Sequence, residues 1–178
     1  MIESFEGKHP VVKGAHFVAW NAQVSGDVVL GEGSSVWFGV SMRADIAPIR
    51  IGAGSNIQDN SVCHVSTDVP LIVGDGVTVG HGAIIHSCTI EDNCLIGMGA
   101  IVLDKAVIGR DSIVAAGSLV TGGKVFPPRS MIMGNPARLV KELSEEQVES
   151  ISGYARRYRD NSRKAAAAYS APGTYPEP

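Results

Sequence analysis

Residues 90–120 read IEDNCLIGMGAIVLDKAVIGRDSIVAAGSLV, and an aliphatic side chain recurs in this stretch at every sixth position. The recurring residues are Ile90, Ile96, Val102, Ile108, Val114 and Val120. An amphipathic helix needs a period near 3.6, whereas a period of six suits short strands whose alternate side chains point inward. The stretch therefore predicts a solenoid in which each block of six residues makes one strand and one turn.

The same period continues toward the N-terminus, interrupted by two insertions and one dropped residue. The upstream residues that open a block are Val12, Val18, Val24, Leu30, Val36, Met42, Ile51, Ile57, Cys63, Val73, Val79 and Ile85. The fifth residue of a block is usually small and the second is often glycine, which fits a narrow prism with tight turns. Eighteen blocks, at three to a turn, predict about six turns stacked at a strand spacing of ~4.8 Å. The predicted fold class is an all-β solenoid, a parallel β-helix of hexapeptide repeats.

A helix is predicted after the repeat. The turn sequence GNPA at residues 134–137 breaks the period, and Ser144 stands three residues before Gln147, a capping-box pattern that marks a helix start. We expect the helix to pack along a face of the prism, its own or that of a neighbouring chain. The prediction is a single domain over residues 1–178, with the β-helix at about 11–140, the C-terminal helix at about 144–169 and a tail at 170–178.

Composition indicates an ordinary globular protein. The formal net charge of −3, with both signs interspersed, shows no basic footprint for nucleic acid. No apolar run approaches the ~18–20 residues of a membrane span, and no secretory signal is visible at the N-terminus. The three cysteines form no C-x-x-C pair, which favours a reducing compartment. We therefore expect a cytoplasmic protein without nucleic-acid or membrane partners.

Three of the five histidines fall within a short stretch, and the repeat predicts where they lie. His64 and His86 are each second in their blocks, one full turn apart, so they should stack on the outside of one face. His81 is third in its block and belongs to another edge, so a symmetric trimer would be needed to bring it to the pair. Three imidazoles with one open position are the ligands of a catalytic Zn²⁺ site, and they also suit Co²⁺ or Fe²⁺. Cys88 is a weaker ligand candidate, because strand alternation disfavours it.

The charged residues follow the same spacing. Arg43 lies one turn before His64, and Asp59 lies one turn before His81. A trimer that joins the histidines would therefore bring Arg43 of one chain to Asp59 of the next. Two further polar residues flank this group, Asp45 and Gln58.

Three segments carry these residues: RAD at 43–45, NIQDNSVCH at 56–64 and VGHGAIIHSC at 79–88. Together they resemble the γ-class carbonic anhydrases and their bacterial relatives, and the resemblance extends over about residues 10–160. It implies a left-handed β-helix and a homotrimer. It also implies a metal at each interface, held by two histidines of one chain and one of its neighbour.

The resemblance also assigns roles to single residues. The metal ligands are His64 and His86 from one chain and His81 from the next. The interface residues are Arg43, Asp59 and Asp45. Gln58 matches the residue that hydrogen-bonds metal-bound water or bicarbonate, and Tyr158 matches a tyrosine near the active site, with Tyr154 as the alternative. The implied reaction is the reversible hydration of CO₂ to bicarbonate by a metal-bound hydroxide.

One departure bears on the rate. The resemblance implies glutamates in an acidic loop that carry the proton to solvent, but Ile46 follows Asp45 here and residues 66–71 contain no glutamate. Two other functions stay open. One is an acyl-CoA thioesterase or acyltransferase, which needs an interface histidine as general base and no metal. The other is a weakly catalytic or non-catalytic trimer kept for assembly or binding.

Overall fold

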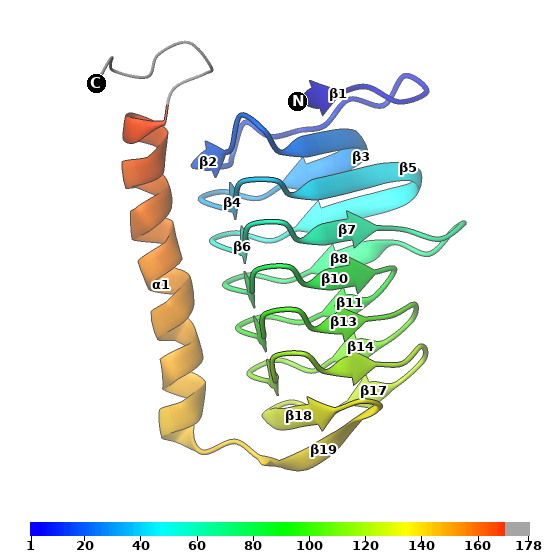
Figure 1. Cartoon of the computed structure of the whole chain (residues 1–178), viewed down its shortest axis with the longest axis vertical. Coiled ribbons are helices and arrows are strands. Elements are labelled where there is room, and N and C mark those ends of the chain that lie inside the picture. The colour runs from blue at the N-terminus through cyan, green and yellow to red at the C-terminus, as the bar shows by residue number, and fades with distance from the viewer. Residues whose placement is uncertain (170–178) are drawn as a thin grey trace.

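The computed structural model describes residues 1–169 and shows a parallel β-solenoid of about seven turns with one helix along its side (Figure 1). This confirms the predicted fold class, the left-handed β-helix of hexapeptide repeats. The expectation of six turns was one too few, because the period continues past Val120 through Phe126 and Ile132, which are both buried. The predicted tail at 170–178 lies outside the described residues.

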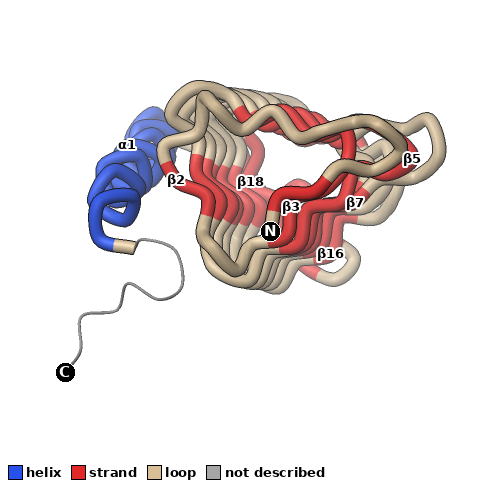
Figure 2. The backbone as a smooth tube through the Cα atoms, turned by 90° about the horizontal axis from the view of Figure 1, so that it is seen from above, coloured by secondary structure: helices blue, strands red, loops and turns tan. Residues whose placement is uncertain are grey.

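The solenoid has three faces, seen end-on in Figure 2. The helix face contains β2 (Phe17–Val18), β4 (Ser35–Val36), β6 (Asn56–Ile57), β9 (Thr78–Val79), β12 (Leu95–Ile96), β15 (Ile113–Val114) and β18 (Ser130–Gly134). The histidine face contains β7 (Val62–His64), β10 (Ile84–His86), β13 (Ile101–Val102) and β16 (Leu119–Val120). The third face contains β8 (Leu71–Val73), β11 (Thr89–Ile90), β14 (Val107–Ile108) and β17 (Val125–Phe126).

Four strands complete the sheets. The long strands β3 (Gln23–Leu30) and β5 (Ser41–Ile51) run from the histidine face onto the third face. At the N-terminal end, β1 (Ile2–Glu3) pairs in parallel with β3. At the other end β19 (Ala137–Glu142) turns back and pairs antiparallel to β18, so the solenoid ends in a reversed strand.

The residues that open the blocks form the core. From Val24 to Val120 every one of them is buried, and the small fifth-position residues are buried with them. Most serine hydroxyls among these small residues bond to the backbone of the adjoining turn, and Ser34 Oγ donates to Gly31 O within its own turn. Ser55 Oγ, for example, donates to Gly74 O at 2.7 Å and accepts from Val77 N at 2.9 Å. The corner serines are therefore buried without leaving a polar group unpaired.

Glycine in the second position of a block is explained by the close approach of successive turns. Gly52 has an ordinary negative φ, but a Cβ at this position would lie 2.3 Å from the carbonyl carbon of Gly74 in the next turn. Any larger side chain at position 52 would force the two turns apart. The expectation that these glycines ease tight turns was therefore wrong for Gly52, where space between turns is the limiting factor.

The helix α1 (Glu145–Ala168) begins with the expected capping box. Ser144 Oγ accepts from Gln147 N, and the Gln147 side chain accepts from Ser144 N. The helix contacts β2, β4, β6 and β9, so it covers a face of its own chain (Figures 1 and 2). Its buried residues are Ile151, Ala155, Ser162 and Ala165. Within residues 1–169 no helix is long and apolar enough to cross a membrane.

Candidate metal centre

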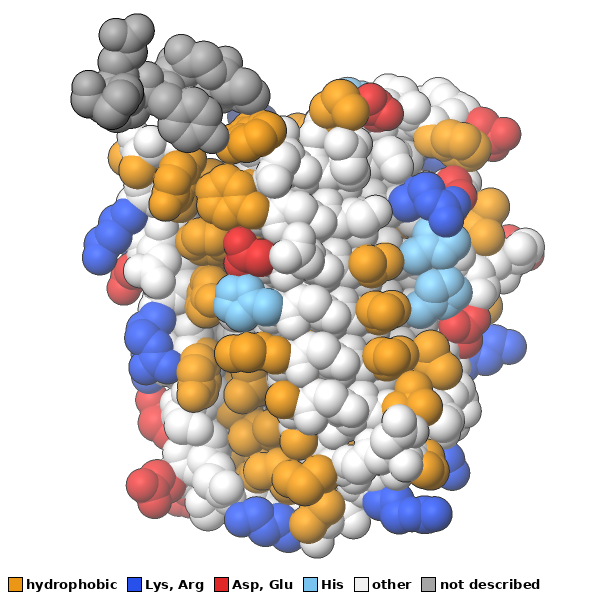
Figure 3. Space-filling view, in the orientation of Figure 1, with side chains coloured by type: hydrophobic (Ala, Val, Ile, Leu, Met, Phe, Trp, Pro, Cys, Tyr) orange, Lys and Arg blue, Asp and Glu red, His pale blue; other side chains and the backbone are white. Residues whose placement is uncertain are grey.

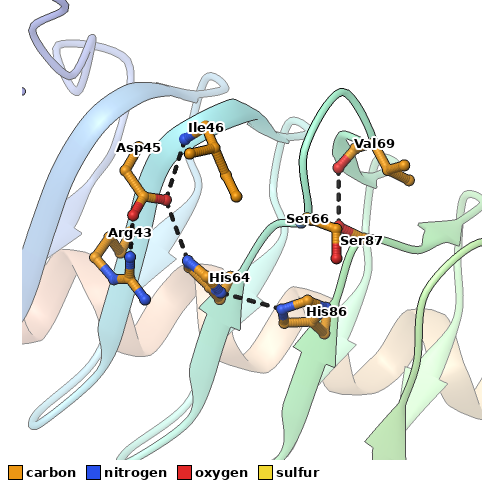
Figure 4. Close-up of polar contacts among 8 residues, drawn as sticks. All are labelled: Arg43, Asp45, Ile46, His64, Ser66, Val69, His86 and Ser87. Atoms are coloured by element: carbon orange, nitrogen blue, oxygen red, sulfur yellow. Dashed lines mark hydrogen bonds and ion pairs between the residues drawn. The ribbon is translucent and has the colours of Figure 1, made fainter. Parts of the chain in front are cut away.

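Two of the three candidate histidines stack on the histidine face. His64 ends β7 and His86 ends β10, and the two residues are direct partners in the parallel ladder. Their ring centroids lie 5.1 Å apart, and His64 Nδ1 faces His86 Nε2 at 3.0 Å (Figure 4). The predicted stacking is therefore present in the structure. Two nitrogens bound to one tetrahedral zinc at ~2.0–2.1 Å would lie roughly 3.3 Å apart, so this pair has nearly the spacing of two metal ligands.

Each histidine of the pair turns its other nitrogen to a carboxylate. Asp45 Oδ1 lies 3.1 Å from His64 Nε2, and Asp104 Oδ1 lies 2.6 Å from His86 Nδ1. When these carboxylates are ionised they accept the imidazole N–H groups, so each of the facing nitrogens carries a lone pair. Two lone pairs 3.0 Å apart repel unless a proton or a metal ion lies between them. The pair therefore fits a divalent metal.

Both carboxyl groups are held in the ionised form. For Asp45, burial opposes ionisation, but hydrogen bonds from the backbone and His64 and the charge of Arg43 keep its pKa below the usual value. For Asp104, the hydroxyl of Ser66 contributes most to a lowered pKa, and His86 adds to it against a smaller opposing effect of burial. Both groups are thus hydrogen-bond acceptors at neutral pH.

His81 lies at a different corner, in the turn between β9 and β10. Its Nδ1 is 2.9 Å from Asp59 Oδ2, and the Tyr158 hydroxyl of α1 is 3.4 Å from its Nε2. Burial and the nearby charge of Asp59 raise the pKa of Tyr158, so the phenol stays protonated and can donate. Gln58 is buried beside them and donates to Asn56 Oδ1 at 3.1 Å.

A groove of about 310 Å³ opens at His81 between α1 and the helix face. Gln58, Tyr154 and Tyr158 line it together with apolar residues that include Leu95 and Ile113. Both tyrosines reach the groove, but it is the Tyr158 hydroxyl that contacts His81. The geometry therefore favours Tyr158 over Tyr154 as the tyrosine of the site.

One chain does not unite the three histidines. His81 stands where the chain enters the histidine face and His86 where it leaves, five residues later, so up to roughly 16 Å of extended chain separates them. Figure 3 shows histidine side chains on the left and on the right of the molecular face that it draws. Within residues 1–169 no three His, Cys, Asp or Glu side chains converge as a metal-binding group.

The structure also places the other predicted residues. Arg43 forms an ion pair with Asp45 of its own chain, while Asp59 is paired with His81, so one chain keeps Arg43 and Asp59 apart. Cys88 is buried, and burial raises the pKa of its thiol to about 12, which makes it a poor ligand at neutral pH.

Sequence reasoning missed Asp104 and Ser66. Asp104 is the third residue of the block opened by Val102, which pairs with Ile85. Counting one turn beyond His86 leads to Leu103, so the register brings Asp104 to the next position and its rotamer turns the carboxylate to the imidazole.

Known proteins that are similar to this chain include carbonic anhydrases. The carbonic anhydrase of Geobacillus kaustophilus is 46% identical over 158 residues, which cover 89% of this chain and 87% of that protein. Gamma carbonic anhydrase 2, mitochondrial, of Arabidopsis thaliana is 44% identical over 85% of this chain. The chain belongs to the γ-class carbonic anhydrase family.

Other comparisons give the coverage of these relatives and further proteins that share the fold. The chain spans 56% of the length of that plant relative. The family described as "Bacterial transferase hexapeptide (six repeats)" matches residues 87–122. A crystal structure from Bacillus cereus described as a putative acetyltransferase superposes with a TM-score of 0.91 at 38% identity, covering 95% of this chain and 98% of that one.

Proposed function

We propose that the protein is a metal-dependent carbonic anhydrase that interconverts CO₂ and bicarbonate as a homotrimer. The main support is that the histidines lie at two corners of the solenoid. His64 and His86 form a pair at one corner, and His81 lies at another, where it contacts Asp59 and Tyr158. In the proposed trimer His64 and His86 of one chain and His81 of its neighbour hold one metal. Three imidazoles suit zinc, with cobalt or ferrous iron as alternatives.

Apolar surface beside both halves of the site supports the trimer. On the histidine face Val62 and Ile84 are 37% and 36% exposed, directly next to the histidine pair in β7 and β10. On the other side, Leu95 and Ile113 line the groove at His81. Burying both surfaces against each other would be favourable and would bring the two halves together. In that arrangement Arg43 of one chain would meet Asp59 of the next.

The residues of each chain then have separate tasks. A divalent metal held by His64, His86 and the neighbour's His81 would supply an acidified water as nucleophile near neutral pH. Gln58 is buried and fixed by Asn56, so its amide can orient that water or bicarbonate by hydrogen bonding. The Tyr158 hydroxyl faces His81 Nε2 in the single chain; once that nitrogen holds the metal, the protonated hydroxyl would be released as a second donor to the water or bicarbonate. The apolar groove wall would hold CO₂ by contact.

The chain offers few acidic side chains for the transfer of the proton to solvent. Ile46, 47% exposed, stands after Asp45, and the loop at residues 65–70 contains no glutamate. We therefore expect turnover to depend on buffer as proton acceptor, so that the hydration rate rises with buffer concentration. We also propose that the protein is cytoplasmic.

The decisive experiment mixes two inactive variants. His81→Ala keeps the histidine pair, and the double variant His64→Ala/His86→Ala keeps His81. Neither homotrimer contains a complete site, but a trimer that contains both variants has one complete site at one of its three interfaces. Co-expression in equal amounts should restore about a quarter of the wild-type sites, read as bound metal and as CO₂ hydration by stopped flow.

The matched control is His9→Ala, which removes a histidine that contacts Ser4 far along the chain from the site. It should retain full metal content and rate. Mixed trimers that stay metal-free and inactive, although wild type is loaded and active, would disprove the shared site. A wild-type trimer that binds no metal and hydrates no CO₂ would overturn the proposed function itself.

An acyl-CoA thioesterase or acyltransferase is the second candidate, favoured by the Bacillus cereus structure described as a putative acetyltransferase. The groove beside His81 is the place where an acyl group would bind. Assaying a panel of acyl-CoA substrates with and without chelator separates the two activities. Chelator should abolish CO₂ hydration but leave a histidine-based acyl transfer intact.

A further inference from the structure

Asp104 touches the candidate metal centre from a turn that the three-histidine motif does not include. Its Oδ1 accepts from His86 Nδ1 at 2.6 Å, a short, charge-assisted distance. We propose that Asp104 is a positioning residue for His86, and that Ser66 in turn positions Asp104; this rests on the proposed metal-dependent function.

The backbone holds Asp104 in place from both sides. In the turn above, Lys105 N donates to Ser87 O at 2.7 Å, and in the turn below, Gly123 N donates to Asp104 O at 2.8 Å. The carboxylate is therefore carried by a rigid rung of the solenoid. Because its position is set by stacking, it can select one orientation of the His86 ring.

The contact also selects the tautomer. An ionised Asp104 keeps the imidazole proton on Nδ1, which leaves the Nε2 lone pair directed at the space shared with His64. Metal-bound histidines usually donate their second N–H to a carboxylate or carbonyl, and this partner orients the ring and raises its basicity. Asp45 makes the equivalent contact with His64 at 3.1 Å.

Ser66 ties this arrangement to the loop at residues 65–70. Its hydroxyl donates to the second oxygen of Asp104, and Ser87 Oγ donates to Val69 O at 2.8 Å in the same loop. Figure 4 shows Ser66, Val69 and Ser87 beside the histidine pair. The loop that lacks glutamate is thus fastened to the ligand His86 through Asp104.

The first test uses metal-free protein, so it does not depend on the proposed activity. Nitrogen-15 NMR of the side chains should show His86 protonated at Nδ1 in the wild type. Asp104→Ala should shift His86 toward a mixture of tautomers, whereas Asp68→Asn, which changes an acidic residue of the loop at residues 65–70 that has no contact with His86, should not. An unchanged His86 tautomer in Asp104→Ala would overturn the positioning role even if the metal binds normally.

The second test measures zinc affinity by competition with a chromophoric chelator. Asp104→Ala should weaken binding by about 10–100-fold and Asp104→Asn by less, because the amide oxygen still accepts the N–H but carries no charge. Ser66→Ala should cause a smaller loss that Ser66→Thr restores by returning the hydroxyl. Equal affinity of Asp104→Ala, Asp68→Asn and wild type would refute the proposal, while a wild type without any zinc binding would count against the proposed function alone.

Discussion

The two corners of the candidate site are built in different ways. His64 and His86 sit on paired strands, face each other at 3.0 Å, and each has a carboxylate on its outer nitrogen. His81 sits in a turn, its side chain is 42% exposed, and its second contact comes from Tyr158, 77 residues further along the chain. The pair needs only the register of the solenoid, whereas the single histidine also needs the helix.

This difference suggests a division of labour. A rigid half that is complete within one chain can capture a metal, and a half that depends on helix docking can complete the site when a second chain arrives. Changes to the strand register should therefore disturb the pair, and changes to the helix should disturb the corner of His81.

Removing core support under the pair should have the largest effect. Ile85 lies in β10 next to His86 and is fully buried, so Ile85→Ala should lower the free energy of unfolding by about 2–5 kcal/mol. Denaturant titration at fixed protein concentration measures this. The control is Ile84→Ala, the same change one residue earlier on a side chain that is 36% exposed, which should cost far less in the folded chain and instead weaken association.

Equal losses for the two variants would show that residues 84 and 85 do not alternate between outside and inside. In that case the histidine pair would not share an outward face with Ile84, and the apolar surface proposed for the trimer would lose its basis.

Loosening the helix should have a smaller and more local effect. Ser144→Ala removes the capping hydroxyl that accepts from Gln147 N. This should lower the stability of the helix by about 1 kcal/mol. Hydrogen exchange should then speed up for the first turns of α1, while the β7 amide of Val62, which donates to Ala83 O, keeps its protection. The matched control, Ser150→Ala, changes an exposed serine inside the helix and should leave exchange nearly unchanged. Equal loosening of β7 would contradict the independence of the two corners.

Much of this arrangement could be predicted from the sequence, because a solenoid converts spacing into position. Counting by sixes placed His86 on His64 and Asp59 beside His81, and the structure shows both contacts. The helix start at Ser144 was also predicted, since a capping box is a purely local signal.

The remainder depended on side-chain directions that spacing does not specify. Asp104 lies one turn beyond His86, but only its rotamer decides whether the carboxylate turns toward the imidazole. Likewise, Arg43 was placed near the site correctly by register, yet its side chain turns to Asp45 within the single chain. The shared metal and the trimer stay predictions, because contacts between copies cannot be counted along one chain.

The smallest expected effect concerns the weaker hold on His81. The Tyr158 hydroxyl lies 3.4 Å from His81 Nε2, whereas Asp104 Oδ1 lies only 2.6 Å from His86 Nδ1. Because the longer contact is weaker, Tyr158→Phe should lower the free energy of unfolding by only about 0.5 kcal/mol. The ring contact with Trp37, with centroids 5.4 Å apart, persists in the phenylalanine variant and preserves the packing of the helix.

Alkaline absorbance titration supplies the specific readout for the Tyr158 hydroxyl. Since burial and Asp59 raise the pKa of Tyr158, its phenol stays protonated below pH ~10 and ionises after an ordinary tyrosine. The late-ionising component should vanish in Tyr158→Phe and persist in Tyr154→Phe. If it persists in Tyr158→Phe, then Tyr158 is not the half-buried donor at His81, and the helix does not hold this corner in the way the comparison requires.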